Sequence, residues 1–398
     1  MNNPKLTGIV TLYDLKDKGI FVSLKPDFLN ELNDRIRLIG IYKLANILQI
    51  SKRILCHWLT ESSLIRLDIL LKIVDYFHYS DLESKIYFLR GKDGNKIYNP
   101  KLPFDFRNSS GVRLIASILG DGGLSNKNDI IYSNTNNVLI KDFIDDLNNI
   151  LGKVEVYTCR QVKDKSIIKV VYPPSFLRHV FNLIGIKTGK KVVNNPEIPF
   201  FINDLPPRFR YDFISKIIDD EGTINIKAKY ISITSAVENN HNNPNILLGV
   251  QALLKMEGIH SVIYGNRSYN SNRGRIRILR SLQINRYDQL KKLYNNLNIK
   301  DKNKSRKLKI LLDSYTQFHY LKCSCKQIYL SKMKDIEAKN GYFTARDLSI
   351  ALRRKVGYIR NVLNKYNRNG VVNKIEGVKS DGIRFYPAKF MIKNEQLY

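Results

Sequence analysis

The sequence predicts an α+β protein in which two pseudo-symmetric αββαββα repeats lie between a helical N-terminal unit and a basic C-terminal unit. Three observations predict this architecture. Hydrophobic residues recur with helical and strand periods in the same order in two stretches of the middle of the chain. Each stretch opens with an apolar helix that ends in an acidic residue followed by glycine. The 398 residues are also long enough for several domains.

Glycines and prolines mark the first boundary. Residues 91–103 contain Gly91, Gly94, Pro100 and Pro103, and this composition is typical of a linker. The predicted units are an N-terminal region (1–100), a first repeat (104–200), a second repeat (201–312) and a C-terminal domain (315–398).

The elements of the two repeats follow the same general order. In the first repeat we expect a helix, a strand, a helix, two strands and a helix at 111–122, 129–134, 138–151, 153–159, 166–172 and 174–184. In the second we expect a helix, a hairpin, a helix, two strands and a helix at 211–222, 223–235, 244–257, 260–265, 274–280 and 285–297. The internal repeat is the most informative feature of the sequence.

The first helix of each repeat ends in a candidate metal-binding residue. The two helices end in Asp121 and Glu221, which are 221 − 121 = 100 residues apart. A glycine follows each acid and permits the left-handed conformation that stops a helix. A carboxylate at a helix C-terminus is disfavoured by the helix dipole, and a cation would relieve that cost. Two such helices side by side would place both carboxylates at one end of their interface, and Mg²⁺ prefers few carboxylates together with waters and phosphate oxygens.

The segments Leu114–Gly122 and Ile214–Gly222 resemble the motif of the LAGLIDADG, or DOD-type, homing endonuclease family. The resemblance covers residues 104–312, about half of the chain. It implies a monomer in which two saddle-shaped halves bind duplex DNA. It further implies that Asp121 and Glu221 bind a divalent metal, each acid serving one DNA strand. The family often has basic residues near the site, and the matching candidates are Lys190 and Lys307, whose alternative interpretation is a solvated basic loop.

One helix departs from the family pattern. The family packs its two motif helices through small residues at the third and seventh positions, which Ala116 and Gly120 satisfy in the first helix. The second helix has Lys216 and Asp220 there. Burying these charges is costly unless they are paired. DNA cleavage is therefore less firmly predicted than DNA binding, since some relatives of this fold bind DNA without cutting it.

The overall charge points to a polyanionic partner. Lys and Arg outnumber Asp and Glu by 66 to 36, for a formal net charge of +30. A positive field of this size favours nucleic acid, and we expect double-stranded DNA. No stretch approaches the roughly 20 apolar residues that a membrane span needs. Four cysteines form no disulfide framework in a chain of this length, so we expect an intracellular, cytoplasmic and nucleoid-associated protein.

Two basic strand patterns in the second repeat are predicted to face DNA. Arg273, Arg275 and Arg277 alternate with Gly274, Ile276 and Ile278, which places the arginines on one face of a strand. Lys227 and Lys229 alternate likewise with apolar residues. Arginines on such a face read guanine and lysines hold phosphates, whereas the alternative is an ordinary solvated face.

The flanking units resemble known DNA-binding folds. Residues 41–77 resemble a repressor-type helix-turn-helix. Its second helix, at 52–59, presents Lys52, Arg53 and His57 and buries Ile54, Leu55 and Trp58. Residues 344–386 resemble a winged helix whose second helix carries Arg360 and Lys365. A generic helical bundle is the alternative interpretation of each. Cys323 and Cys325, with His319, are too few for structural zinc.

The leading hypothesis is a site-specific, Mg²⁺-dependent double-strand DNA endonuclease. Because the chain ends in Gln396–Leu397–Tyr398 and lacks terminal splicing residues, we expect a free-standing protein rather than an intein. Two alternatives stay open. One is a non-cleaving DNA-binding transcriptional regulator on the same scaffold, and the other is a splicing helper that binds structured RNA.

Overall fold

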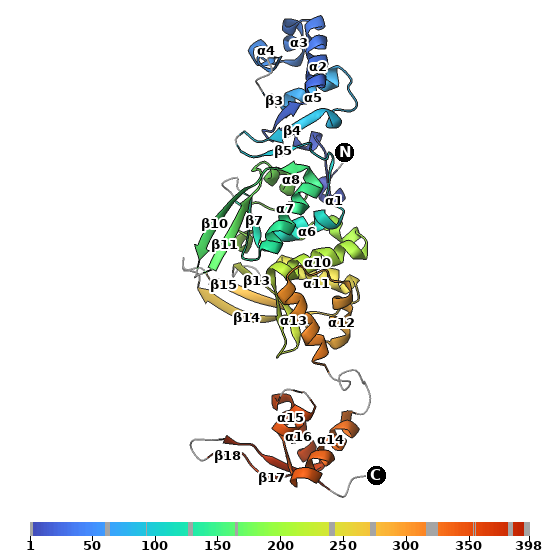
Figure 1. Cartoon of the computed structure of the whole chain (residues 1–398), viewed down its shortest axis with the longest axis vertical. Helices are drawn as coiled ribbons and strands as arrows, with labels where there is room; N and C mark the ends of the chain where they lie inside the picture. Colours follow the sequence, from blue (N-terminus) through green and yellow to red (C-terminus); the bar gives the residue numbers. More distant parts are fainter. Residues whose placement is uncertain are drawn as a thin grey trace.

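The computed structural model describes residues 3–393 apart from 60–63, 93, 126–129, 164–165, 239–242, 271–275, 316–324, 353, 355 and 381–384. The fold is α+β, as predicted. The molecule is elongated, with the N-terminal region at one end, the repeats in the middle and the C-terminal domain at the other end (Figure 1). No helix in the described part of the chain is both long enough and apolar enough to cross a membrane.

The N-terminal region combines helices with a sheet that the sequence analysis did not predict. The helices are α1 (Pro4–Thr7), α2 (Pro26–Ile39), α3 (Ile41–Leu48), α4 (Lys52–Leu59) and α5 (Leu67–Tyr76), with the 3₁₀ turns η1 (Tyr13–Leu15) and η2 (Glu83–Lys85). The strands are β2 (Phe21–Leu24), β3 (Ile65–Arg66), β4 (Ile86–Arg90) and β5 (Lys96–Tyr98), which belong to a five-stranded sheet of order β3-β2-β4-β5-β9. The strands are short and lie between strong helical patterns, which explains why the alternation in sequence was weak.

The segment predicted to be a linker, residues 91–103, contains the strand β5 of this sheet. Its strand β5 pairs with β9 (Lys153–Val154) of the first repeat, with Ile97 opposite Val154. Gly152, at φ +108°, precedes β9 and packs so closely that a Cβ would lie 2.5 Å from the carbonyl oxygen of Asn99. A second connection joins β1 (Ile9–Val10) to β6 (Phe104–Asp105). The N-terminal region and the first repeat are therefore joined by main-chain hydrogen bonds as well as by the chain.

The two repeats have the same order of elements. The first contains α6 (Ser109–Leu119), β7 (Gly122–Leu124), β8 (Ile130–Asn134), α7 (Asn137–Leu151), β10 (Tyr157–Lys163), β11 (Ser166–Tyr172) and α8 (Leu177–Leu183). The second contains α10 (Pro207–Glu221), β12 (Gly222–Asn225), β13 (Tyr230–Glu238), α11 (Asn245–Met256), β14 (Val262–Asn270), β15 (Ile276–Ile284) and α12 (Tyr287–Asn296). The sheet orders are β10-β11-β8-β7 and β12-β13-β15-β14. Numbered within its own repeat and listed from the same edge, each sheet has the order third, fourth, second, first.

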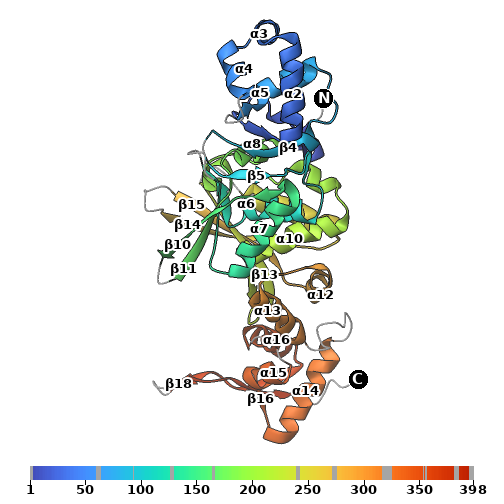
Figure 2. The same ribbon diagram turned by 45° about the horizontal axis from the view of Figure 1, so that its top comes forward.

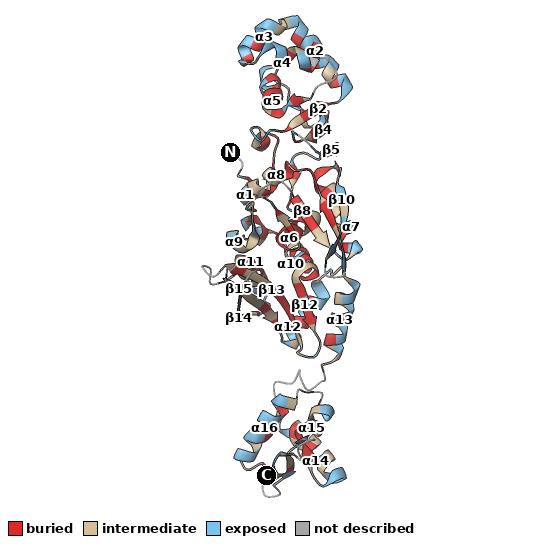
Figure 3. Ribbon diagram, turned by 90° about the vertical axis from the view of Figure 1, so that its left-hand side faces the viewer, coloured by how far each residue is buried: buried red, intermediate tan, exposed pale blue. Residues whose placement is uncertain are grey.

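Helices α6 and α10 form the centre of the molecule. They lie against each other between the two sheets and are buried along most of their length (Figure 3). A helix that is apolar all round is buried, and α6 follows this rule from Val112 to Leu119. At the end of the pair away from the acids, the Ser109 hydroxyl donates a 2.5 Å hydrogen bond to Asp212. The ends that carry Asp121 and Glu221 are thus fixed by the core of the whole fold.

Short segments follow each repeat. These are α9 (Lys191–Asn194) and η3 (Phe200–Asp204) after the first and α13 (Lys302–Asp313) after the second. The C-terminal domain has its own hydrophobic core and contains α14 (Cys325–Asn340), β16 (Phe343–Thr344), α15 (Ala345–Ala351), α16 (Val356–Arg368), β17 (Val372–Glu376), β18 (Lys379–Ser380), β19 (Phe385–Tyr386) and β20 (Lys389–Ile392) (Figure 2). The sequence analysis missed α14 and expected the other helices within a few residues.

Candidate active site

The glycines that follow the two acids allow the chain to turn back tightly on its own helix. A Cβ at Gly122 would lie 2.7 Å from the Ser117 carbonyl oxygen and 2.9 Å from the Cα of Ile118. A Cβ at Gly222 would lie 2.8 Å from the Cα of Ile218. Gly222 has φ −81°, and Gly122 is not among the positive-φ residues. The expected left-handed conformation is therefore wrong, and the close approach of strand to helix is what requires glycine.

Asp121 lies at the end of α6 and is held by a neighbouring strand. The side-chain amide of Asn134 on β8 donates a 2.7 Å hydrogen bond to Asp121 Oδ2. Burial, together with the nearby carboxylates of Asp220 and Glu221, raises the pKa of Asp121 to about 7. Lys191 and Lys216 act against this shift. Asp121 is therefore close enough to the acids of the second helix to interact with them electrostatically.

Glu221 occupies the matching position on α10. Burial raises the pKa of its carboxyl group, and Asp220 adds to the shift, whereas Lys191 and Lys304 oppose it. Two buried carboxylates with raised pKa values are typical of functional sites. The paired helices thus bring Asp121 and Glu221 into one electrostatic environment.

Each helix end is capped by a lysine from the segment that follows its repeat. Lys191 Nζ donates to the carbonyl oxygens of Leu119 (3.0 Å) and Gly120 at the end of α6. Lys304 Nζ donates to the carbonyls of Ile218 (2.9 Å) and Asp219 (2.5 Å) at the end of α10. A cation at a helix C-terminus satisfies free carbonyls and complements the helix dipole.

These capping lysines are neighbours of the residues that the sequence singled out. Lys190 and Lys307 are exposed, while Lys191 and Lys304 contact the helix ends. Lys190 does line the cavity beside Asp121. Adjacent lysines in a sequence are indistinguishable by composition, and only the path of the chain decides which one points inward. Lys307, the other basic residue that the resemblance implied near the site, is on the exposed side of α13.

The charged residues of α10 that break the small-residue pattern are paired with each other. Lys216 Nζ lies 3.1 Å from Asp220 Oδ1, and the side chains of both have 0% exposure. Tyr132, on β8 of the first repeat, completes the group: its hydroxyl accepts from Lys216 at 2.8 Å and donates to Asp220 at 2.9 Å. We call Lys216, Asp220 and Tyr132 the interface triad. It links the two repeats across the helix interface, so the departure from the pattern is accommodated by hydrogen bonds.

The small residues of α6 provide the space for the interface triad. A Cβ added at Gly120 would lie 2.8 Å from both the Cβ and the Oδ2 of Asp220. Asp220 Oδ2 has no hydrogen-bond partner among the described residues. The interface is therefore asymmetric, with small residues on one helix facing large charged residues on the other.

Replacing Gly120 with alanine is expected to destabilise this interface by about 1–3 kcal/mol, because the new methyl group overlaps Asp220 and cannot be relieved by a side-chain rotation alone. Urea unfolding of the full chain measures the change in the free energy of unfolding. Gly123→Ala is the matched control, since a Cβ at Gly123 meets nothing within 4 Å. Equal stability of the two variants would contradict the close packing described above.

A cavity lies beside each acid. One of about 510 Å³ is lined by Asp121, Gly189, Lys190 and Lys191, and another of about 330 Å³ by Glu221, Asn195, Thr234 and Lys191. Lys191 borders both cavities. No group of three or more Asp, Glu, His or Cys residues able to hold a metal occurs in the described part of the chain. Any metal at this site would therefore rely on two carboxylates together with water or a bound phosphate.

The predicted DNA-facing residues of the second repeat divide into three groups. Arg273 and Arg275 lie outside the described residues. Arg277 lies on β15, five residues before the buried Leu282. Its side chain is therefore on the opposite face of the sheet, away from the core. Lys227 and Lys229 do not alternate on a strand as expected, because residues 226–229 form the turn between β12 and β13.

The two turn lysines have different surroundings. Lys227 is exposed. Lys229 donates to the carbonyl of Ser314 at 2.8 Å and lies 4.5 Å from the centre of the Tyr315 ring. Lys229 thus attaches the end of α13 to the second repeat.

The flanking helices present the basic residues that the sequence analysis named. Lys52 and Arg53 on α4 are exposed, while Leu55 and Trp58 are buried. Ile54, expected to be buried, is 42% exposed, because the short helix packs on α3 through one narrow face only. Gln49, at φ +56°, makes the turn between the two helices.

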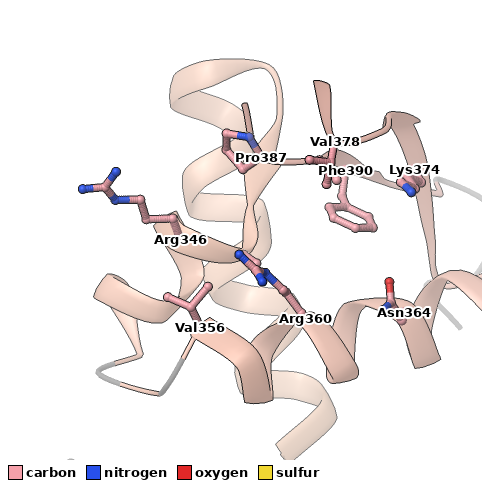
Figure 4. Close-up of a pocket in the computed structure, with 10 residues that line it drawn as sticks. Arg346, Val356, Arg360, Asn364, Lys374, Val378, Pro387 and Phe390 are labelled. Atoms are coloured by element: carbon pink, nitrogen blue, oxygen red, sulfur yellow. The ribbon is translucent and has the colours of Figure 1, made fainter. Parts of the chain in front are cut away.

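In the C-terminal domain a groove separates α16 from the strands. Arg360 and Asn364 of α16 face Phe390 and Lys374 across it, while Arg346 points away (Figure 4). Arg360 and Lys365 are both exposed on α16. The groove combines an apolar floor with cations at its edges.

Comparison with known proteins gives a distant structural likeness. No family model and no curated protein matches the sequence. Among solved structures, the crystal structure of I-DmoI in complex with DNA and Mn is similar over 48% of this chain and 98% of that chain, at 18% identity and a TM-score of 0.31. A likeness of this extent establishes neither a common activity nor a common ligand.

Proposed function

We propose that the protein is a site-specific endonuclease of the LAGLIDADG type that hydrolyses both strands of a DNA duplex with the help of a divalent cation. One observation carries the proposal: Asp121 and Glu221 lie at the paired ends of two helices packed in the centre of a pseudo-symmetric fold. Burial and the carboxylates of Asp220 and Glu221 raise the pKa of Asp121, and an ionised carboxylate in such a place destabilises the fold, which is typical of functional sites.

The donor set fits a hard cation such as Mg²⁺. Asp121 and Glu221 would hold it, and Mg²⁺ commonly uses one or two carboxylates together with waters and substrate phosphates. When bound, such an ion lowers the pKa of a coordinated water and neutralises charge on the phosphate. Each acid borders its own cavity, so two phosphates, one from each strand, have a place to approach.

Lys191 would assist by electrostatics. Two of its three N–H groups are used on the carbonyls of Leu119 and Gly120, which leaves one for an oxygen of a bound phosphate. Burial lowers the pKa of Lys191, and the neighbouring carboxylates of Glu221, Asp121 and Asp220 oppose that shift. Asn134 orients the carboxylate of Asp121. The interface triad fixes the separation of the helices and hence of the two acids.

A long DNA contact is supported by the distribution of charge. The net charge of +30 extends over an elongated molecule whose two ends carry exposed basic helices, α4 with Lys52 and Arg53 and α16 with Arg360 and Lys365. We propose that these helices contact DNA on either side of the repeats, with Arg277 and Lys227 contributing from the second sheet. Binding should then weaken steeply with salt, by about 0.9 logarithmic units per phosphate contact for each tenfold increase in salt.

Cleavage of a plasmid library tests the proposal. Full-length protein incubated with supercoiled plasmids carrying random inserts is expected to produce discrete double-strand breaks with Mg²⁺ and none with EDTA. Glu221→Gln should lose the breaks, because the amide no longer supplies a charged ligand. Asp145→Asn, an exposed acid on α7, is the matched control and should keep them. Binding without any breaks would instead favour the non-cleaving regulator.

The choice of nucleic acid is tested separately. At one salt concentration the protein is expected to bind a DNA duplex more tightly than a structured RNA of the same length. The dissociation constants can be compared by gel retardation. A clear preference for RNA would overturn the proposal in favour of an RNA-binding splicing helper.

A further inference from the structure

A cavity at the junction between the N-terminal region and the first repeat collects cationic side chains. It has a volume of about 560 Å³ and lies where α8 approaches the strands of the N-terminal sheet (Figure 1). Lys18 and Lys92 come from the N-terminal side, and Arg178 and His179 come from α8. We call it the junction cavity. It shares no lining residue with the cavities beside Asp121 and Glu221 among the described residues.

The cations of the junction cavity have no counter-charge in the part of the chain that the structure describes. No acidic residue is among the described residues that line it, and no ion pair of Lys18, Lys92 or Arg178 occurs there. Asp93, next to Lys92 in sequence, lies outside the described residues. Burial lowers the pKa of His179, and the nearby charges of Arg178 and Lys18 lower it further. These groups are therefore close enough to repel one another, which destabilises the empty cavity.

The walls of the junction cavity suit an oxyanion. Gly19 (φ +64°) and Gly94 (φ +117°) have open space where a Cβ would lie, so they leave room for a ligand. Ser175 and Asn95 add polar groups, and the Asn95 amide is fixed by a 3.2 Å hydrogen bond to the Tyr172 carbonyl of the first repeat. Guanidinium and ammonium groups that converge on one space bind phosphate through charge-assisted hydrogen bonds.

We propose that the junction cavity binds a phosphate group, held between the N-terminal region and the first repeat. Two sources share this chemistry: the backbone of a bound DNA and a free phosphate or nucleotide. In either case the phosphate neutralises the cations from both sides and strengthens the contact between the two parts of the chain. The proposal does not depend on DNA cleavage.

The His179 ring reports occupancy directly. The chain has six histidines, so the His179 signal can be assigned in NMR spectra of the full-length protein with a His179→Gln variant. Millimolar inorganic phosphate is expected to shift this signal and to raise the pKa of His179, because a nearby anion favours the imidazolium. Sodium chloride at the same ionic strength should not.

Two variants and a second probe, a DNA duplex, distinguish a free phosphate from a phosphate of the DNA backbone. Arg178→Ala and, on the opposite wall, Lys18→Ala should each weaken the phosphate response, whereas Lys291→Ala, an exposed lysine on α12, should leave it unchanged. A short DNA duplex of arbitrary sequence is the second probe. A His179 shift with phosphate alone identifies a free ligand, and a shift with the duplex that Lys18→Ala reduces identifies the DNA backbone. If neither probe moves the His179 signal, the proposal is overturned.

Discussion

Replacing Asp121 with asparagine is expected to abolish DNA cleavage, by about 10³-fold or more, and at the same time to make the fold more stable at pH 8. Cleavage is lost because a neutral amide is a poor ligand for a hard cation. Stability is gained because an ionised carboxylate is removed from a place where burial and two neighbouring carboxylates disfavour it. Loss of activity and gain of stability in one variant would mark a functional residue.

The direction of the pH dependence follows from the pKa of Asp121. It is about 7 in the folded protein, above the roughly 3.9 of an unfolded chain. A raised folded pKa contributes stability that is fully present below the unfolded value and is lost as the pH rises through the folded value. The advantage of Asp121→Asn should therefore be at most about 4 kcal/mol at pH 8, shrink as the pH falls and vanish below about pH 4.

Urea unfolding at pH 4, 6 and 8 in the presence of EDTA measures this advantage, and the plasmid assay measures cleavage. Adding Mg²⁺ at pH 8 should stabilise the wild type more than the variant, because the cation relieves the repulsion between the carboxylates. Asp145→Asn is again the control and should change neither quantity. An Asp121→Asn protein that still cuts DNA, or that has the wild-type stability at every pH, would exclude the role given to Asp121.

Replacing Lys216 with methionine is expected to destabilise the fold by about 3–5 kcal/mol, because removal of one partner leaves the buried carboxylate of Asp220 without its counter-charge. Burial already raises the pKa of Asp220, and Lys216 is the strongest influence that opposes the shift. Asp220 should therefore be protonated in the variant. The packing of α6 against α10 should also change near Asp121 and Glu221.

The double variant Lys216→Met/Asp220→Ala separates the ion pair from simple packing. Since it removes both charges, we expect it to recover a large part of the stability that Lys216→Met loses. Tyr132→Phe should cost about 1 kcal/mol, the usual contribution of a hydrogen bond. Denaturant unfolding of the wild type, Lys216→Met, Asp220→Ala and the double variant gives the coupling energy of the ion pair. A Lys216→Met variant as stable as the wild type would show that the interface triad does not hold the repeats together.

Sequence patterns located the helices and both acids because these depend on local periodicity. The helical spacing of apolar residues was enough to find α6 and α10. An acid followed by glycine at the same place in each repeat then indicated Asp121 and Glu221. The reason for the glycines was not available from sequence. Only the fold shows that a strand turns back against the last turn of each helix.

Contacts between distant segments escaped prediction. The sheet that joins β5 to β9 connects residues far apart in the chain, and its short strands carry little periodicity of their own. The choice of Lys191 over Lys190, and of Lys304 over Lys307, depends on which face of a segment meets a helix end. A basic run in a sequence predicts a cation near the site without specifying which residue supplies it.

The sequence by itself determined that this protein has two acid-tipped helices in two matching repeats, and that its charge suits a polyanion. Tertiary structure alone decided that Lys216 and Asp220 are compatible with a close helix interface. Their hydrogen-bond partner Tyr132 belongs to the other repeat. Gly120 on the other helix has no side chain and so leaves room for Asp220. The physical reason is that the cost of a buried charge depends on every group within a few ångströms of it, and those groups are brought together by folding and not by sequence order.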